Sequence, residues 1–109
     1  MAYDEALAGR LHEALAERTD VSERKMFGGL AMMVAGNMAV GIIGDELMVR
    51  VGPDTYEDTL DQPHARVMDF TGRPMKGFVL VASEGIAADP DLRAWVSRGV
   101  AYASSLPAK

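Results

Sequence analysis

The chain has 109 residues and a formal net charge of −5, and it contains no cysteine. This length predicts a single domain, residues 1–109, that buries roughly two thirds of the surface of its unfolded chain. The lack of cysteine excludes a disulfide framework, a thiolate nucleophile and any Cys-ligated metal. The acidic balance disfavours direct binding to nucleic acid or to an anionic membrane, because both need an excess of Lys and Arg.

The first predicted element is a helix over residues 4–18. Leu7, Leu11 and Leu15 recur there at every fourth position, which predicts an amphipathic helix with one apolar stripe. The residues at its start are acidic, whereas a signal peptide begins with bases followed by a long apolar core. We therefore expect a cytoplasmic protein.

An uncharged run follows from Met26 to Gly44. Its length is close to the roughly 20 apolar residues that cross a bilayer. However, Gly36-Asn37 at its centre has the residue types of a two-residue hairpin turn, and β-branched residues flank it. The run also contains glycines that are unfavourable inside a helix: Gly28, Gly29, Gly36, Gly41 and Gly44. It therefore predicts a buried β-hairpin and no membrane span.

The rest of the chain predicts further strands and helices, bounded by turn residues. They are a strand over Leu47–Val51, a short helix with Tyr56 and Leu60 inside, strands over Arg66–Phe70 and Met75–Ala82, and a helix from Asp89-Pro90 to Pro107, with Asp89 as its N-cap. The order is helix, three strands, helix, two strands, helix. It predicts a two-layer α+β domain with the helices on one face of an antiparallel sheet.

Both faces of this predicted sheet are largely apolar. Alternate residues of a strand point to opposite faces of the sheet, and two-residue turns set how neighbouring strands pair. With this pairing, we expect Val40 and Ile42 on the face that the helices cover. Three helices hardly cover both faces, and an exposed apolar face usually marks an interface. We therefore predict a homodimer whose contacts come from the second face: Leu30, Met32, Val34, Ile43 and Met48.

Metal-ligating and catalytic patterns are incomplete in this sequence. His12-Glu13 begins like the helical HExxH zinc signature, but Ala16 replaces the second histidine, and His64 is the only other histidine. The serines lie in no nucleophile elbow, and the paired carboxylates fall at turns or helix starts. We predict no catalytic residue, no metal, no cofactor and no enzymatic activity.

Two segments combine basic residues with glycines that let a ligand approach the backbone. One contains Arg24, Lys25, Phe27, Gly28 and Gly29, and the other contains Gly72, Arg73, Lys76 and Gly77. Neither matches a P-loop or a dinucleotide fingerprint. The bases could hold a phosphate or carboxylate, or could pair with neighbouring acids such as Glu23 and Asp69. Both interpretations stay open at this point.

The segments RKMFGG (24–29) and DFTGRPMKG (69–77), around Gly36-Asn37 and Leu47–Val51, resemble the TfoX N-terminal domain family along essentially the whole chain. The resemblance implies an α+β sandwich similar to type III secretion chaperones. It also implies a regulatory role, because the TfoX/Sxy regulators act in transcription of competence genes alongside the cyclic-AMP receptor protein. Those regulators carry a second, C-terminal domain, whereas the resemblance here is to their N-terminal domain alone. We therefore expect this chain to be a stand-alone domain.

The sequence thus supports two hypotheses of different classes. The first is a non-enzymatic interaction domain that forms a homodimer and meets a regulatory protein partner through the region of Arg24, Lys25, Phe27, Arg73 and Lys76. The alternative is a receptor in which the same bases and glycines bind a small anion. Direct DNA binding ranks third, because the chain is acidic.

Overall fold

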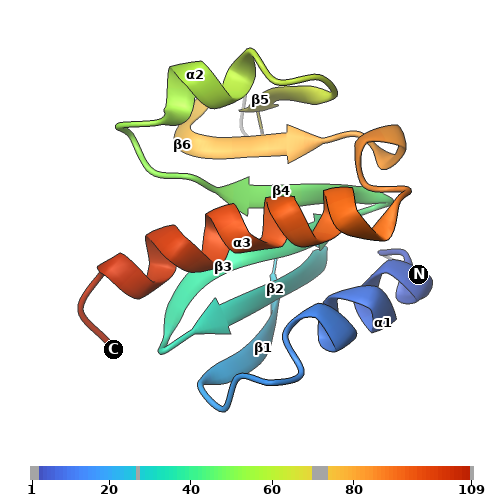
Figure 1. Ribbon diagram of the computed structural model, residues 1–109, viewed down its shortest axis with the longest axis vertical. Coiled ribbons are helices and arrows are strands. Elements are labelled where there is room, and N and C mark those ends of the chain that lie inside the picture. The colour runs from blue at the N-terminus through green and yellow to red at the C-terminus, as the bar shows by residue number, and fades with distance from the viewer. Residues whose placement is uncertain (1–2, 27, 70–73, 109) are drawn as a thin grey trace.

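The computed structural model describes residues 3–26, 28–69 and 74–108 of the chain. Within these ranges the helices are α1 (Glu5–Ala14), α2 (Tyr56–Leu60), the 3-10 helix η1 (Ser83–Gly85) and α3 (Asp89–Ser105). The strands are β1 (Val21–Met26), β2 (Gly29–Val34), β3 (Asn37–Ile43), β4 (Glu46–Arg50), β5 (Ala65–Asp69) and β6 (Pro74–Val81). Helices and an antiparallel sheet make this an α+β fold, as predicted (Figure 1).

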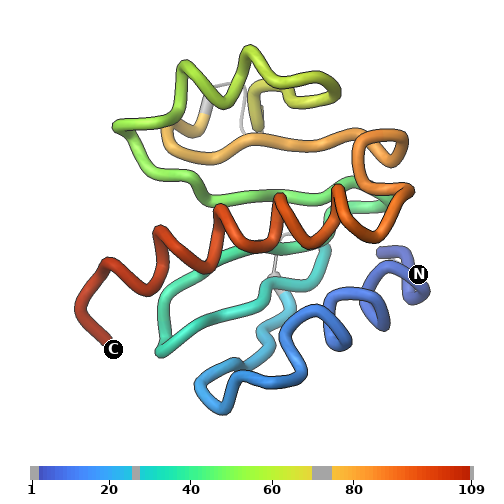
Figure 2. The backbone as a smooth tube through the Cα atoms, in the orientation of Figure 1, coloured from blue at the N-terminus to red at the C-terminus, as the bar shows by residue number. Residues whose placement is uncertain are grey.

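The strands form one open antiparallel sheet in the order β1-β2-β3-β4-β6-β5. α3 crosses the middle of the sheet, and α1 lies beside it towards β1 and β2 (Figure 1). The two ends of the chain lie on opposite sides of the molecule (Figure 2). None of the helices in the described ranges is long and apolar enough to span a membrane. The uncharged run forms β2 and β3 instead, so the predicted hairpin is confirmed.

Strand β1 is absent from the sequence-based prediction, which gave three strands before the second helix. β1 is an edge strand that pairs only with β2, and its residues from Ser22 to Lys25 are exposed. An edge strand with exposed side chains lacks the alternation of apolar and polar residues by which strands are recognised. The observed order is therefore helix, four strands, helix, two strands, helix.

One face of the sheet packs against all three α-helices. The strands contribute valine, leucine, isoleucine and methionine side chains, and the helices contribute Leu7 and Leu11 from α1, Tyr56 from α2, and Leu92 and Trp95 from α3. The strand residues of this cluster are Leu30, Met32, Val40, Ile42, Leu47, Val49, Val79 and Val81. Removal of these side chains from water is the main stabilising contribution to such a domain.

This core contradicts the predicted faces of β2. Leu30 and Met32 pack with Val40 and Ile42 under the helices, and Val34 packs with Ala103 of α3. The prediction of these three residues as dimer contacts on the second face is therefore wrong. Ile43 and Met48 do lie on the second face, where they pack with Met68 and Leu80.

A shift in strand register explains the difference. The hairpin turn is Ala35-Gly36, with φ values of 51° and 84°, and Val34 pairs with Asn37. The prediction had placed the turn one residue later. The register then shifts between Met32 and Met33, so that Met33 pairs with Met38 but Met32 pairs with Val40. A β-bulge inserts one residue into one strand and so reverses the faces beyond it.

The last helix, α3, begins at the predicted residue, but its N-cap differs from the prediction. Asp89 accepts hydrogen bonds from Arg10 of α1, at 3.0 Å from Nη2, and the N-cap position belongs to Ala88. Further along, Gly99 brings α3 against the backbone of β3. An added Cβ at Gly99 would meet the carbonyl oxygen of Ala39 and would lie 2.7 Å from Cγ1 of Val40. The glycine therefore sets how closely α3 approaches the sheet.

Candidate functional sites

The two basic segments lie on well-separated strands. Arg24 and Lys25 are on the edge strand β1, and Lys76 is on β6, with β2, β3 and β4 between them. Four strand spacings of about 4.8 Å separate β1 from β6 by roughly 19 Å. Phe27 and Arg73 lie outside the described residues. The described bases of the two segments therefore do not converge on one small anion.

Arg24 and Lys25 also diverge from each other. Arg24 pairs with Ala31 and Lys25 pairs with Leu30, which lie on opposite faces of the sheet. The glycines beside them serve the backbone. An added Cβ at Gly29 would meet the carbonyl oxygen of Ile42 on the neighbouring strand, and Gly28 has a φ of 71°. The glycine pair thus makes the β1–β2 turn and the close β2–β3 contact.

The second face of the sheet is a methionine-rich surface. Met48, Met68 and Leu80 are buried there, and half-buried side chains surround them: Met38, Ile43, Met75 and Phe78. Arg66 crosses this face to Glu46 and donates to its carboxylate, with Nη2 at 2.7 Å from Oε1. That hydrogen bond raises the pKa of Arg66. We call these residues, with Glu46 and Arg66, the methionine face.

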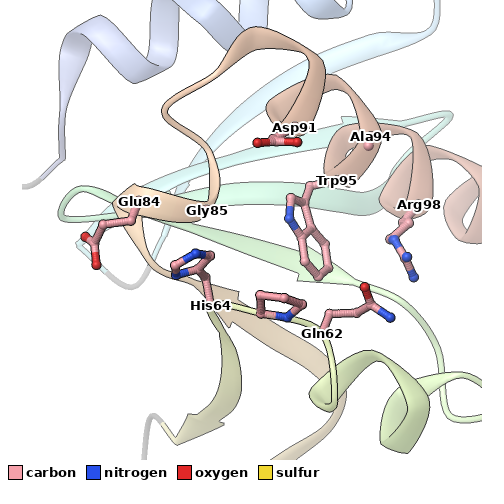
Figure 3. Close-up of a pocket in the computed structure, with 9 residues that line it drawn as sticks. Gln62, His64, Glu84, Gly85, Asp91, Ala94, Trp95 and Arg98 are labelled. Atoms are coloured by element: carbon pink, nitrogen blue, oxygen red, sulfur yellow. The ribbon is translucent and has the colours of Figure 1, made fainter.

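A pocket of about 360 Å³ lies on the other side of the molecule, beside α3. One wall comes from α3, through Asp91, Ala94, Trp95 and Arg98, and the opposite wall comes from the turn after α2 and from η1: Gln62, Pro63, His64, Glu84 and Gly85. Figure 3 shows Asp91 and Trp95 in the middle of the view, with His64 and Glu84 on one side of them and Arg98 and Gln62 on the other. We call this the α3 pocket.

The wall opposite α3 is held in a strained conformation. His64 has a φ of 68°, a left-handed conformation that costs a non-glycine residue about 1–3 kcal/mol. Its carbonyl accepts a hydrogen bond from Ala82 at 3.0 Å. An added Cβ at Gly85 would lie 2.7 Å from Cβ of His64, so only glycine lets the two segments approach. The backbone of His64 is therefore held close to Ala82 and Gly85.

The charged groups of the α3 pocket contact different neighbours. The guanidinium of Arg98 lies over the Trp95 ring, 5.1 Å from its centroid. The Ser83 hydroxyl donates to Glu84 at 2.8 Å and lowers the pKa of that carboxyl, with a smaller contribution from the charge of His64. Among the residues that the structure describes, no ion pair joins Arg98, Glu84 or Asp91 to an opposite charge. The pocket thus presents both signs of charge.

Sequence analysis assigned no site to this pocket. Asp91, Trp95 and Arg98 recur at helical spacing, which is a detectable signal of one helix face. The other wall comes from residues about 30 positions earlier in the chain and from the turn before α3. Only the fold brings them together.

No metal site emerges from the described residues, since none of their His, Asp and Glu side chains form a group of three or more that could hold an ion.

The sequence model of the TfoX N-terminal domain family matches residues 13–103 of the chain. No curated protein and no solved structure matches it significantly. The match covers nearly the whole chain, including both segments that suggested the resemblance.

Proposed function

We propose that this chain, which belongs to the TfoX N-terminal domain family, is a non-enzymatic regulatory domain that acts through protein–protein contacts. Its first partner is a second copy of itself, bound through the methionine face. One observation carries this proposal: the helices pack on one face of the sheet, while the other bears an apolar cluster around Met48, Met68 and Leu80.

The composition of the methionine face suits contact with a protein. Methionine side chains are flexible and polarisable, and they are common at adaptable binding surfaces. The half-buried members of the cluster, among them Met38 and Ile43, still have area to remove from water. Burial of such area is the usual driving force for protein association.

A second copy is the partner that this face fits best. A two-fold interface places the same patch on both chains, so the patch must be complementary to itself. An unpaired charge would meet its own copy across such an interface and oppose it. Glu46 and Arg66 already neutralise each other within one chain, so the cluster can face its copy without an unmatched charge from this pair.

The mass of the protein in solution tests the proposal. Light scattering after size exclusion, at tens of micromolar, should give about twice the chain mass of 11.7 kDa. Met38→Glu and Ile43→Glu place a carboxylate on the methionine face and should give the monomer mass. Val67→Glu is the matched control, because Val67 is an exposed strand residue on β5 whose partner Val79 belongs to the other face.

Each result decides for or against the interface. A wild-type monomer at this concentration would refute the homodimer, and a dimer that survives both substitutions would place the contact elsewhere. Circular dichroism melts of all variants separate dissociation from unfolding. Binding of a regulatory protein is tested after this step, because no surface of the described residues is assigned to that partner.

A further inference from the structure

The side chain of Arg50 lies over two aromatic rings at the end of β4. Its guanidinium carbon is 5.6 Å from the centroid of the Phe78 ring on β6 and 5.3 Å from the centroid of the Tyr102 ring on α3. Figure 1 shows this end of β4 beside the C-terminal half of α3. The negative faces of aromatic rings attract a cation. We call Arg50, Phe78 and Tyr102 the Arg50 clamp.

The backbone beside the clamp is shaped to receive one of these rings. Gly52, two residues after Arg50, has a φ of 85°, and a Cβ added there would overlap the ring of Tyr102. The carbonyl of Gly77, the residue before Phe78, accepts a hydrogen bond from the backbone of Gly52 at 3.1 Å. The turn that follows β4 is therefore fixed to β6, and the missing side chain leaves room for the ring.

The N–H groups of Arg50 are open to a ligand. Among the residues that the structure describes, none accepts a hydrogen bond from the Arg50 side chain or forms an ion pair with it. The side chain is half-buried, and the described ranges contain no buried side-chain nitrogen without a hydrogen-bond partner. The donors of the guanidinium therefore reach solvent.

The acids nearest to Arg50 in the sequence do not neutralise it. Glu46 accepts a hydrogen bond from Arg66, with Nη2 at 2.7 Å from Oε1. Asp54 is exposed and forms no ion pair within the part of the chain that the structure describes. The clamp thus holds a positive charge that lacks a protein anion beside it in the described ranges.

Two further bases surround the clamp. Lys76 is an exposed residue of β6, two positions before Phe78, and Arg98 lies one helical turn before Tyr102. Arg98 and Tyr102 also line a cavity of about 340 Å³, whose other lining residues are uncharged: Val51, Thr55 and Ala101. Strands β4 and β6 and helix α3 therefore each bring a base to this end of the sheet.

We infer that the Arg50 clamp binds a phosphate group, either free or as the monoester of a small molecule. A guanidinium presents a planar fork of N–H donors that matches two oxygens of a phosphate. A phosphate monoester carries a charge of about −1.5 to −2 at neutral pH, so the neighbouring Lys76 and Arg98 favour it over a carboxylate with one charge. The aromatic rings restrict the arginine before the ligand arrives, which lowers the entropic cost of binding.

A nuclear magnetic resonance titration tests this inference, because it detects weak binding. Inorganic phosphate and glycerol phosphate are added to the full chain at constant ionic strength, and the Nε–H signal of Arg50 is followed. At least one of them should move this signal in a saturable way, and the tighter of the two identifies the source of the phosphate. Acetate should bind about tenfold more weakly, because it carries one charge and accepts fewer hydrogen bonds.

Substitutions separate the clamp from charge alone, with the backbone amide signal of residue 78 as the readout. Arg50→Lys keeps the charge but loses the fork of donors, and it should weaken phosphate binding by about tenfold. Phe78→Leu removes one ring and should weaken binding by about threefold. Arg93→Gln removes an exposed arginine about 13 Å along α3 from Tyr102 and should leave binding unchanged. Melting temperatures show whether each variant folds.

The clamp borders the methionine face, because Phe78 belongs to both. The titration is therefore repeated with Ile43→Glu, since Ile43 pairs with Glu46 at the opposite end of β4 from Arg50. Saturable binding by either protein supports the inference, whatever the oligomeric state of the wild type. Three results would overturn it: no saturable change in either protein, acetate binding as tight as phosphate binding, and equal affinities of the wild type and Arg50→Lys. The inference can therefore fail while the proposed homodimer stands, and the reverse is also true.

Discussion

The close packing of α3 on the sheet can be tested by replacing glycine with alanine at two positions, Gly99 and Gly9. Both glycines lie inside helices, where alanine is favoured over glycine by about 1 kcal/mol. An added Cβ at Gly9 meets nothing within 4 Å, so Gly9→Ala should raise the free energy of unfolding by about 0.5–1 kcal/mol.

At Gly99 the same methyl group meets the backbone of β3. It would lie 3.0 Å from the carbonyl carbon of Ala39 and would overlap the oxygen, so α3 must move away from the sheet. Overpacking of this kind costs about 1–3 kcal/mol. After the gain of about 1 kcal/mol in helix propensity, Gly99→Ala should lower the free energy of unfolding by up to about 2 kcal/mol.

Urea denaturation, followed by circular dichroism at one protein concentration, measures both changes. A fixed concentration matters because the proposed dimerisation would make the unfolding midpoint depend on concentration. In a thermal melt the two variants should separate by several degrees, at about 4 °C per kcal/mol for a domain of this size. If Gly99→Ala proved as stable as Gly9→Ala, the close contact of α3 with Ala39 and Val40 would be refuted.

Two further substitutions test local contacts. Asn37 is buried and its side-chain amide donates to the carbonyl of Pro107 at 2.9 Å, so Asn37→Ala should lower the free energy of unfolding by about 1 kcal/mol in the same urea assay; an unchanged midpoint would contradict this bond. The hydrogen bond from Arg18 lowers the pKa of Asp20, so Arg18→Gln should raise that pKa towards its ordinary value in a carboxyl NMR titration. Because the folded pKa is depressed, the stabilising effect of this pair is present above the ordinary carboxyl pKa and is lost as the pH falls through the folded value. Equal pKa values of Asp20 in the two proteins would argue against the pair.

Strands and helices with regular apolar spacing were predictable from the sequence. The hairpin in the uncharged run was recognised because glycine and β-branched residues exclude a helix there. The last helix was placed correctly at Asp89 because proline at the second position favours a first turn. Its N-cap was not, since the Asp89 carboxylate is engaged by Arg10 of another helix. That contact depends on tertiary structure.

The faces of the sheet were harder to predict than its strands. Side chains alternate along a strand, so one assumed register decides the face of every residue in it. The shift between Met32 and Met33 changes the register within the hairpin, and the predicted faces are then reversed. The extra residue is Ala39 of β3, and nothing in the residues of the hairpin marks this bulge beforehand. Leu30 and Met32 were therefore placed on the methionine face, although both are buried beneath the helices.

The α3 pocket could not be predicted, for a related reason. Its walls join three separate parts of the chain, and its most unusual residue, His64, is distinguished only by a backbone angle. The separation of Arg24 from Lys76 was equally hidden, because it depends on the strand order. A missed edge strand changes that order, and with it the distance between the two basic segments.

The two outer strands of the open sheet have a consequence for solubility. An unpaired strand edge is a template on which further chains can add, and charged side chains there oppose such growth. β1 exposes Glu23, Arg24 and Lys25, and β5 exposes Arg66 and Asp69. Chains that met edge to edge would have to accommodate these charges, which disfavours fibrils. The edges therefore resist indefinite polymerisation, and the apolar sheet face stays available for the proposed dimer.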